Sequence, residues 1–480
     1  MYKERYEMFG VRVSAGLVRW FQTINLHIAI FSLGRERRSR QPVTRMIIKR
    51  APLWHSKQCV QRLSWHAFEV LKGCIFGLTG ATLLDLSKIY LTSPRAMAYT
   101  ITTRGIGSII FCIFAGVILR YVNIQVVMIM SLLVASLCVA LNPLLGQLTF
   151  CHIAMFFLGG TFGLIEVGSN GWIIGIWQEK SATVFQFFNF CFGLGGVVAP
   201  LVAEPFLSKV HSRHTVIETI VNGSIGNSLK ILPSTADTTV YIPYLLLGSL
   251  IFVNTAFMII SYAFSRSNIS PGNSTSSDST CSRRSELIIV AAFSAYVFFI
   301  VSLEQTYVSM LAVYVVENER LDFSKSNSAY VSAVFWLFFT LSRVVSTFAS
   351  LCMRPSSMLI VCHSICLLGA TALIIAGKWS PIIVWISTGL MGAGVSPMFA
   401  TSLSHVMQYI LLSHTYMSLV MLCVSAGGMM SPILVGPYIE EEPFVFLYVN
   451  LTQAIIATFL MIFLVVFTRG IQIRPAMKKK

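Results

Sequence analysis

The sequence predicts an all-α integral membrane protein, with twelve transmembrane helices arranged as two six-helix bundles. Of its 480 residues, 55% are hydrophobic and only 11% are charged. Soluble domains carry about 25% charged residues. The mean hydropathy is +0.74. Two further observations support this fold class: the apolar residues gather in bilayer-length stretches, and the two halves of the chain share short motifs.

The apolar stretches have the length that a membrane helix requires, about 20 residues. Backbone groups in hydrocarbon must be hydrogen-bonded within the segment, so each stretch is expected to be a helix. The predicted spans are 67–86, 98–119, 124–143, 150–177, 183–203, 242–264, 286–307, 328–351, 357–376, 381–402, 414–436 and 445–467.

The longest polar interruptions define the domain organisation. The Ser/Gly-rich stretch "SRSNISPGNSTSSDSTCSRRS" reads as a flexible linker between the sixth and seventh spans. Within the N-terminal region, 17–34 is apolar but holds Arg19, and it could be a surface helix, a targeting segment or a poorly ordered extension. The predicted domains are a basic cytoplasmic extension at 1–64, a bundle at 65–264, the linker at 265–285, a bundle at 286–467 and a basic tail at 468–480.

The net charge of +16 is concentrated at the chain ends. The first sixty residues hold twelve Lys/Arg against three Glu, and the chain closes on three lysines. Basic segments favour the cytoplasmic side of a membrane, so both ends are expected inside. No nucleic-acid-binding module is visible. This orientation places the sequon at Asn222 outside, where it is a candidate for glycosylation.

No catalytic or metal-binding pattern stands out. The eleven cysteines are scattered, and their spacing fits neither a zinc site nor a disulfide framework. Metalloprotease, phosphate-loop and serine-hydrolase motifs are not found at a credible site. The sequence therefore predicts that the protein is not an enzyme and needs no cofactor beyond a coupling ion.

The two halves share weak internal symmetry. "GGVVAPLV" with Pro200 matches "GGMMSPILV" with Pro432, and Arg104 in the second span has a counterpart in Arg343 in the eighth. A parallel repeat of six helices is an organisation of transporters, with the substrate between the halves. The two prolines could allow bending during gating, or they could be ordinary packing residues.

The stretch "GLIEVGSNGWIIGIW" contains Glu166 and Asn170 on one helical face. A charged side chain at mid-membrane costs about 2.5–3.5 kcal/mol, so it needs a partner or a function. Burial favours the neutral acid, which suits Glu166 to taking a proton, or a sodium ion if other oxygens join it. The alternative is a carboxylate paired with an arginine purely for folding.

Other polar residues complete the candidate site. Gln186 and Asn189 share a face of the fifth span, and their amides suit sugar hydroxyls or could join helices. Glu304, Trp336 and Arg343 are further candidates for substrate binding. For Trp336 the alternative is anchoring at the lipid interface, and for Arg343, as for Arg104, a structural ion pair.

Asp85, near the outer end of the first span, is a candidate for cation coupling, unless it is simply hydrated.

Several stretches resemble one branch of the major facilitator superfamily. They are "TLLDLSK", "GLIEVGSNGWIIGIW", "QFFNFCFGLGGVVAPLVA", "FWLFFTLSRVVS" and "TGLMGAGVSPMFATS". In this order they are similar to sodium-dependent glucose transporter type 1 and major facilitator superfamily domain-containing protein 4, and more distantly to bacterial fucose–proton symporters. The resemblance implies a monomeric hexose carrier of the plasma membrane, coupled to sodium or protons. Glu166 and Asn189 match motif positions that handle substrate and proton in the symporters.

One departure from the superfamily concerns the connection between the second and third spans. It reads "GVILRY" from Gly116, with Arg120 where an acidic residue that helps hold one gating conformation is expected. This departure and the basic N-terminal extension favour an alternative, a receptor or scaffold that no longer transports. A separate alternative is an uncoupled or proton-coupled carrier of another small polar solute. The expected partners are a sugar and the lipid bilayer.

Overall fold

The computed structural model describes residues 51–177, 181–208, 238–264, 282–410 and 414–471. The chain divides into two compact units, Met1–Cys59 and Val60–Lys480. The described part of the first unit, 51–59, only begins a helix. The predicted alternatives for 17–34 therefore lie outside the described residues, as do Asn222 and most of the linker.

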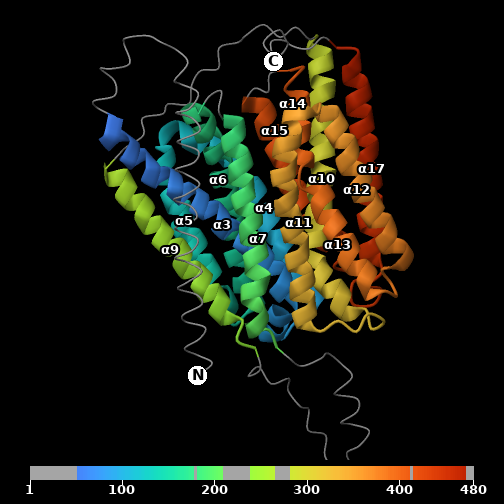
Figure 1. Ribbon diagram of the computed structural model, residues 1–480. Coiled ribbons are helices and arrows are strands. Elements are labelled where there is room, and N and C mark those ends of the chain that lie inside the picture. Colours follow the sequence, from blue (N-terminus) through green and yellow to red (C-terminus); the bar gives the residue numbers. More distant parts are fainter. Residues whose placement is uncertain (1–50, 178–180, 209–237, 265–281, 411–413, 472–480) are drawn as a thin grey trace, which may run out of the picture. The chain divides into compact units, whose positions relative to one another are not determined.

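The second unit is all-helical in its described part (Figure 1). We call the helices before the linker the N-terminal half and those after it the C-terminal half. The N-terminal half contains α3 (Ala51–Ile89), α4 (Pro94–Tyr121), α5 (Ile124–Leu141), α6 (Leu148–Trp177), α7 (Ser181–Ala203) and α9 (Tyr241–Phe264), with short 3₁₀ turns η1 (Asn142–Leu144) and η3 (Glu204–Phe206). The C-terminal half contains α10 (Arg283–Glu317), α11 (Lys325–Cys352), α12 (Pro355–Ala376), α13 (Pro381–Val395), α14 (Met398–Val406), α15 (His414–Gly428), α16 (Met430–Leu434) and α17 (Val445–Arg469).

Eleven helices of the described chain are long and apolar enough to span a membrane, and Tyr416–Gly428 is a shorter apolar helix. The prediction of one continuous span at 414–436 is therefore wrong: α15 ends at Gly428 and α16 begins at Met430. Two consecutive glycines weaken the helix there, and Pro432 lacks the N–H of a regular helical bond. Its counterpart Pro200 lies inside the continuous helix α7.

Local sequence sets several helix boundaries. The Ser93 hydroxyl accepts from Ala96 N–H at the start of α4, and Pro94 occupies the first turn. Asn123 caps α5 and Ser324 caps α11 in the same way. These side chains satisfy N–H groups that have no partner within the helix.

The interpretation of "GVILRY" as a connecting loop is also wrong. Gly116, Arg120 and Tyr121 belong to α4, and the connection to α5 is only Val122 and Asn123. Gly116 is exposed, and a Cβ on it would meet nothing within 4 Å, so no close packing explains the glycine.

The two halves meet where α7 packs against α11 and where α4 packs against α15 and α16. At a third place, α3 approaches α10 so closely that a Cβ on Gly80 would overlap the backbone carbonyl of Val308. Large apolar side chains remain exposed on other helices, for example Ile375 on α12 and Phe459 on α17. Such surfaces are expected where helices face lipid.

Candidate functional site

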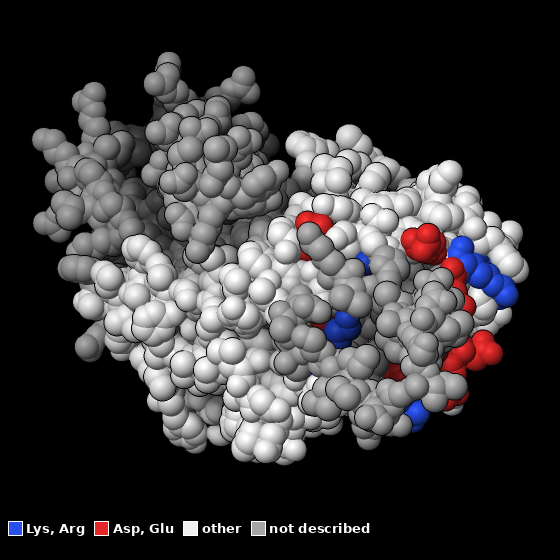
Figure 2. Space-filling view, turned by 90° about the horizontal axis from the view of Figure 1, so that it is seen from below, with Lys and Arg blue, Asp and Glu red and all other residues white. Residues whose placement is uncertain are grey.

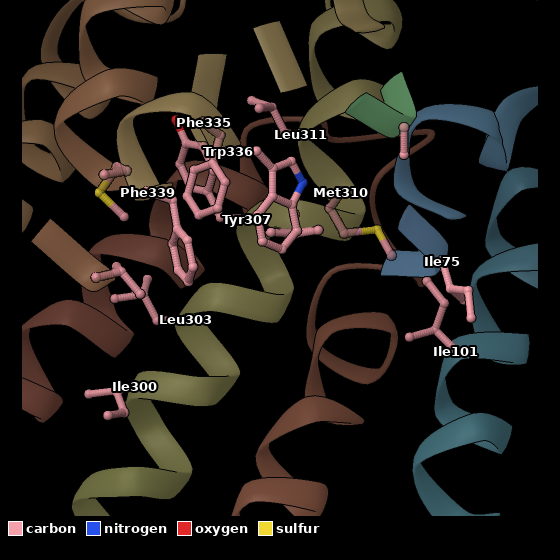
Figure 3. Close-up of a cluster of buried hydrophobic side chains, with 14 of the residues drawn as sticks. Ile75, Ile101, Ile300, Leu303, Tyr307, Met310, Leu311, Phe335, Trp336 and Phe339 are labelled. Carbon is pink, nitrogen blue, oxygen red and sulfur yellow. The ribbon is translucent and has the colours of Figure 1, made fainter. Parts of the chain in front are cut away.

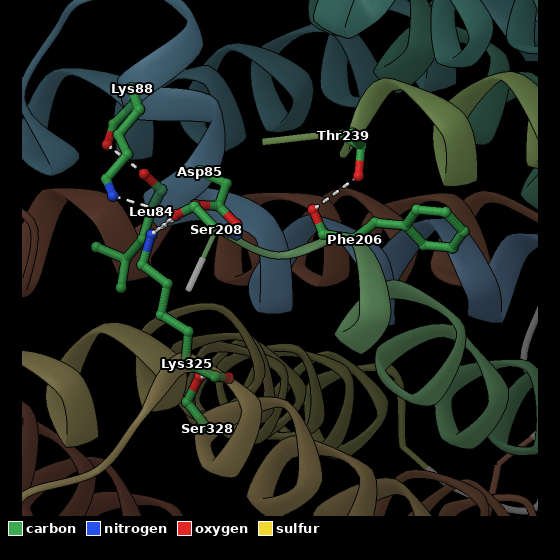
Figure 4. Close-up of polar contacts among 9 residues, drawn as sticks. Leu84, Asp85, Lys88, Phe206, Ser208, Thr239, Lys325 and Ser328 are labelled. Carbon is green, nitrogen blue, oxygen red and sulfur yellow. Dashed lines mark hydrogen bonds and ion pairs between the residues drawn. The ribbon is translucent and has the colours of Figure 1, made fainter. Parts of the chain in front are cut away.

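A buried ion pair joins the two halves at the end of the molecule where α3 finishes and α11 begins (Figure 4). We call this the outer end, following the predicted orientation. The carboxylate of Asp85 on α3 is 1% exposed and lies 2.5 Å from Nζ of Lys325 on α11. The backbone N–H and the hydroxyl of Ser208 donate to the same carboxylate at 3.0 and 2.6 Å. We call Asp85, Ser208 and Lys325 the outer latch.

The outer latch has additional support nearby. Lys88 and Lys325 both donate to the Ser208 hydroxyl, at 3.1 and 2.7 Å. A second contact between the halves runs from the Arg95 N–H to the Glu440 carboxylate at 2.7 Å. Seen from this end, acidic and basic side chains lie next to one another on one part of the surface (Figure 2). Asp85 is therefore a fully buried partner of a lysine and not the hydrated residue that the sequence left open.

A second cluster of charged side chains lies inside the N-terminal half. Lys72 on α3 forms an ion pair with Glu166 on α6, and its Nζ lies 3.6 Å from Oε1 of Glu69, one helical turn earlier. Lys72 is 8% exposed and Glu69 is 3% exposed. We call Glu69, Lys72 and Glu166 the charge cluster. The partner of Glu166 is thus a lysine and not the arginine that the sequence suggested.

The three members of the charge cluster differ in access. The side chain of Glu166 is 35% exposed, whereas that of Glu69 is 4% exposed. Among the residues that the structure describes, Oε1 of Glu69 has no hydrogen-bond partner. Glu166 can therefore be reached from outside the cluster, while Glu69 contributes an enclosed negative charge behind it.

A row of aromatic side chains passes from the charge cluster across the boundary between the halves. Lys72 Nζ lies 5.5 Å from the ring centre of Phe192 on α7. That ring contacts Phe76 on α3 and Trp336 on α11, with centroid distances of 5.5 and 5.4 Å. Trp336 in turn packs against Phe339 at 5.3 Å.

Trp336 is enclosed at the boundary between the halves. It is 1% exposed and lies among the buried side chains of the C-terminal half, with Ile75 and Ile101 on the opposite helices (Figure 3). A Cβ on Gly196 would overlap its indole ring. The alternative that Trp336 anchors the protein at the lipid interface is therefore wrong.

The two arginines lie on opposite sides of this boundary. Arg104 on α4 lies over the ring of Phe76 at 4.3 Å, and Arg343 on α11 lies over Phe339 at 4.7 Å. Both are 6% exposed. Each has guanidinium nitrogens without a hydrogen-bond partner among the described residues: Nη1 of Arg104, and Nε and Nη1 of Arg343. Glu304 on α10 is half-buried and lies within electrostatic reach of Arg343 and Lys72.

The remaining predicted site residues are described to different extents. Asn189 on α7 is half-buried and has an interaction partner. Asn170 and Gln186 lie on α6 and α7, but their side chains fall outside the described set. Their roles in substrate binding stay predictions, as do the gating roles of Arg104, Arg120, Pro200 and Pro432.

Four residues of these clusters were missed by the sequence reasoning: Glu69, Lys72, Ser208 and Lys325. Glu69 and Lys72 lie within the predicted span 67–86, and a charged pair three residues apart in an apolar helix is a signal in itself. Lys325 lies 240 residues from Asp85 in the sequence, so no local pattern could have joined them.

Known proteins similar to this chain include proteins named as sodium-dependent glucose transporters. No protein-family model matches the chain. Human sodium-dependent glucose transporter 1 is 22% identical over 371 residues, which cover 76% of this chain and 70% of that protein. Major facilitator superfamily domain-containing protein 4A of Xenopus tropicalis is 24% identical over 439 residues, which cover 79% and 85%.

Solved structures show the same architecture. FucP, a major facilitator superfamily transporter crystallised in the outward conformation, matches with a TM-score of 0.56 and 16% identity, over 84% of this chain and 99% of that one. The nucleoside transporter NupG matches with a TM-score of 0.56 and 10% identity, over 85% and 98%. The chain therefore has the major facilitator fold, as a multi-pass membrane protein, and the predicted resemblance is confirmed. These proteins are transporters and not enzymes, in agreement with the sequence.

Proposed function

We propose that this protein is a secondary active carrier of a hexose, coupled to sodium, in the plasma membrane. The observation that carries the proposal is the charge cluster of Glu69, Lys72 and Glu166 beside the aromatic row where the halves meet. Buried charges are expensive in a membrane helix, and they are found mainly where ions or solutes pass. The name of the human relative, a sodium-dependent glucose transporter, supports the same substrate and ion.

The aromatic row and the polar groups around it suit a sugar. Flat aromatic faces pack against the apolar faces of sugar rings, and Phe192 and Trp336 present such faces. Arg343 has guanidinium nitrogens that lack partners, and Glu304 and Asn189 are half-buried. Together these groups can donate to and accept from sugar hydroxyls. In this proposal the sugar lies between the halves, with the cation at Glu166.

The outer latch fits one state of an alternating-access cycle. Asp85 and Lys325 hold the halves together at the outer end. To admit a sugar from that side, the carrier must separate these two residues. Cation and sugar then need to bind more tightly to the opened state than to the closed one, because a ligand shifts an equilibrium only through its differential affinity.

The experiment is uptake of labelled glucose and fucose into vesicles that contain the purified full-length protein. We expect uptake driven by an inward sodium gradient, and at least about a tenfold reduction in Glu166→Gln, because the coupling charge is lost. Glu204→Gln is a matched control, since Glu204 lies in the turn η3 at the outer end of α7. Undiminished sodium dependence in Glu166→Gln contradicts the assigned role of Glu166.

Two alternatives have distinct results in the same assay. Uptake that follows an acid-outside gradient, with no response to sodium, indicates proton coupling. Absence of uptake for every solute and gradient favours a receptor or scaffold with this fold, the reading prompted by Arg120. The monomeric state is also a proposal, and the mass of the detergent-solubilised particle tests it.

A further inference from the structure

The charge cluster contains more negative than positive groups. Two carboxylates, of Glu69 and Glu166, face the single ammonium group of Lys72. Glu69 is almost fully enclosed, and its Oε1 has no hydrogen bond within the described part of the chain. With both acids ionised, the cluster lacks one positive charge. An uncompensated buried charge is strongly unfavourable, so the site favours an additional cation.

The neighbouring arginines do not supply this missing charge. Arg104 lies over the ring of Phe76 and, among the described residues, not against a carboxylate of the cluster. Arg343 lies over the ring of Phe339 and within electrostatic reach of Glu304. Neither arginine forms an ion pair with Glu69 or Glu166 among the described residues.

We propose that Lys72 acts as a tethered cation in a site whose two carboxylates can balance two positive charges. Lys72 thereby limits the cluster to one mobile monovalent cation. The two carboxylates can together balance two positive charges, and Lys72 permanently provides one of them. The number of mobile cations then equals the number of carboxylates minus the number of tethered ammonium groups. This inference rests on the proposed cation coupling and sets its stoichiometry.

The geometry supports a fixed lysine beside an exchangeable cation. Lys72 is anchored on the same helix as Glu69, three residues away, so it keeps its place beside both acids. Glu166 is the accessible member, with 35% of its side chain exposed. A small ion can therefore approach Glu166 from the open side while Lys72 remains behind it.

The experiment is equilibrium binding of sodium-22 to the purified full-length protein, in choline chloride and without sugar. Because each unpaired carboxylate takes one cation, we expect about one sodium per wild-type protein and about two for Lys72→Met. Glu69→Gln should bind none, since Lys72 then balances Glu166. The double variant Glu69→Gln with Lys72→Met should return to about one, for the same reason.

A proton could supply the same charge as sodium, and a second measurement distinguishes the two. The infrared absorption of protonated carboxyl groups, recorded in sodium-free buffer, counts acids that hold a proton. If protons fill the site, the wild type binds no sodium and shows one protonated acid, and the four proteins follow the same series in protons. Either series supports the role of Lys72.

Controls separate a counting role from a merely structural one. Lys72→Arg keeps the tethered charge and should bind as many cations as the wild type. Lys378→Met, which removes a lysine whose Nζ donates to Tyr448 on the surface, should also leave the number unchanged. If Lys72→Met fails to fold, Glu69→Gln and the double variant still test the series.

The outcomes also separate this inference from the proposed function. A wild type that binds one cation, with Lys72→Met binding one as well, overturns the role of Lys72 and leaves the coupling intact. Binding of one cation by Glu69→Gln would likewise overturn the role of Lys72 and leave the proposed coupling intact. A wild type that binds neither sodium nor a proton, and whose uptake ignores every gradient, overturns both.

Discussion

The outer latch and the charge cluster consist of the same residue types, carboxylates and lysines, but they serve different functions. In the outer latch, one carboxylate meets one lysine from the other half of the molecule, and Ser208 donates two further hydrogen bonds. In the charge cluster, two carboxylates meet one lysine from the same half, and one carboxylate oxygen has no hydrogen bond to any described residue. The balanced ion pair of the outer latch stabilises a contact between the halves. The charge cluster, with its excess negative charge, instead favours the binding of a cation.

Breaking the outer latch should give the largest effect. Lys325→Met leaves the buried carboxylate of Asp85 unpaired, which typically costs about 3–5 kcal/mol. The outer end should then open. We expect an impermeant maleimide to label a cysteine introduced at Leu84, which lines a cavity of about 210 Å³ at this end, more than about tenfold faster. The exchanged pair Asp85→Lys with Lys325→Asp should partly restore slow labelling. An unchanged rate in Lys325→Met contradicts the latch.

A contact without charge lies between these two clusters, and it should respond less strongly. Gly196→Ala places a methyl group where the indole of Trp336 lies, and overpacking of this kind costs about 1–3 kcal/mol. We expect a lower melting temperature of the purified protein. Combining it with Trp336→Leu should recover part of the loss. A melting temperature equal to that of the wild type would mean that α7 and α11 separate easily at this position.

The smallest expected effect has the opposite sign. Glu69→Gln removes the unpaired charge of the cluster and leaves Lys72 balanced by Glu166, so it should stabilise the sodium-free protein by about 1 kcal/mol. The corresponding change in the latch, Asp85→Asn, should destabilise it, because the Lys325 ammonium group loses the carboxylate that pairs with it. Thermal unfolding in choline chloride tests both. Equal destabilisation by the two substitutions would remove the distinction between the clusters.

The sequence predicted the fold well because the pattern that defines it is local. Apolar stretches of bilayer length mark helices, and the bounds of α12 and α17 lie within two residues of those expected. Helix ends were harder to locate. Arg120 was assigned to a loop because "GVILRY" aligns with the superfamily's connecting-loop motif, yet α4 continues to Tyr121. The break before α16 also went unpredicted. The same motif of two glycines and a proline occurs around Pro200 in an unbroken helix, so the motif alone does not indicate a break.

The site was predicted only in part, for a physical reason. Glu166 and Asp85 attract notice because a carboxylate in an apolar stretch is rare. Their partners depend on which helices touch, and sequence spacing does not contain that information. Lys72 reaches Glu166 across 94 residues, and Lys325 reaches Asp85 across 240. Trp336 was placed correctly in the eighth span, but its enclosure against Gly196 required the packing of the two halves.

The excess of one carboxylate in the charge cluster has an electrical consequence. A carrier that holds its cation would move a neutral cluster between its two states, whereas the empty carrier would move one negative charge. One elementary charge crossing the full membrane is worth about 2.3 kcal/mol per 100 mV. An inside-negative voltage would therefore leave the loaded step unaffected and draw the empty binding site back toward the outside, so that voltage sets the pace of the return half of the cycle.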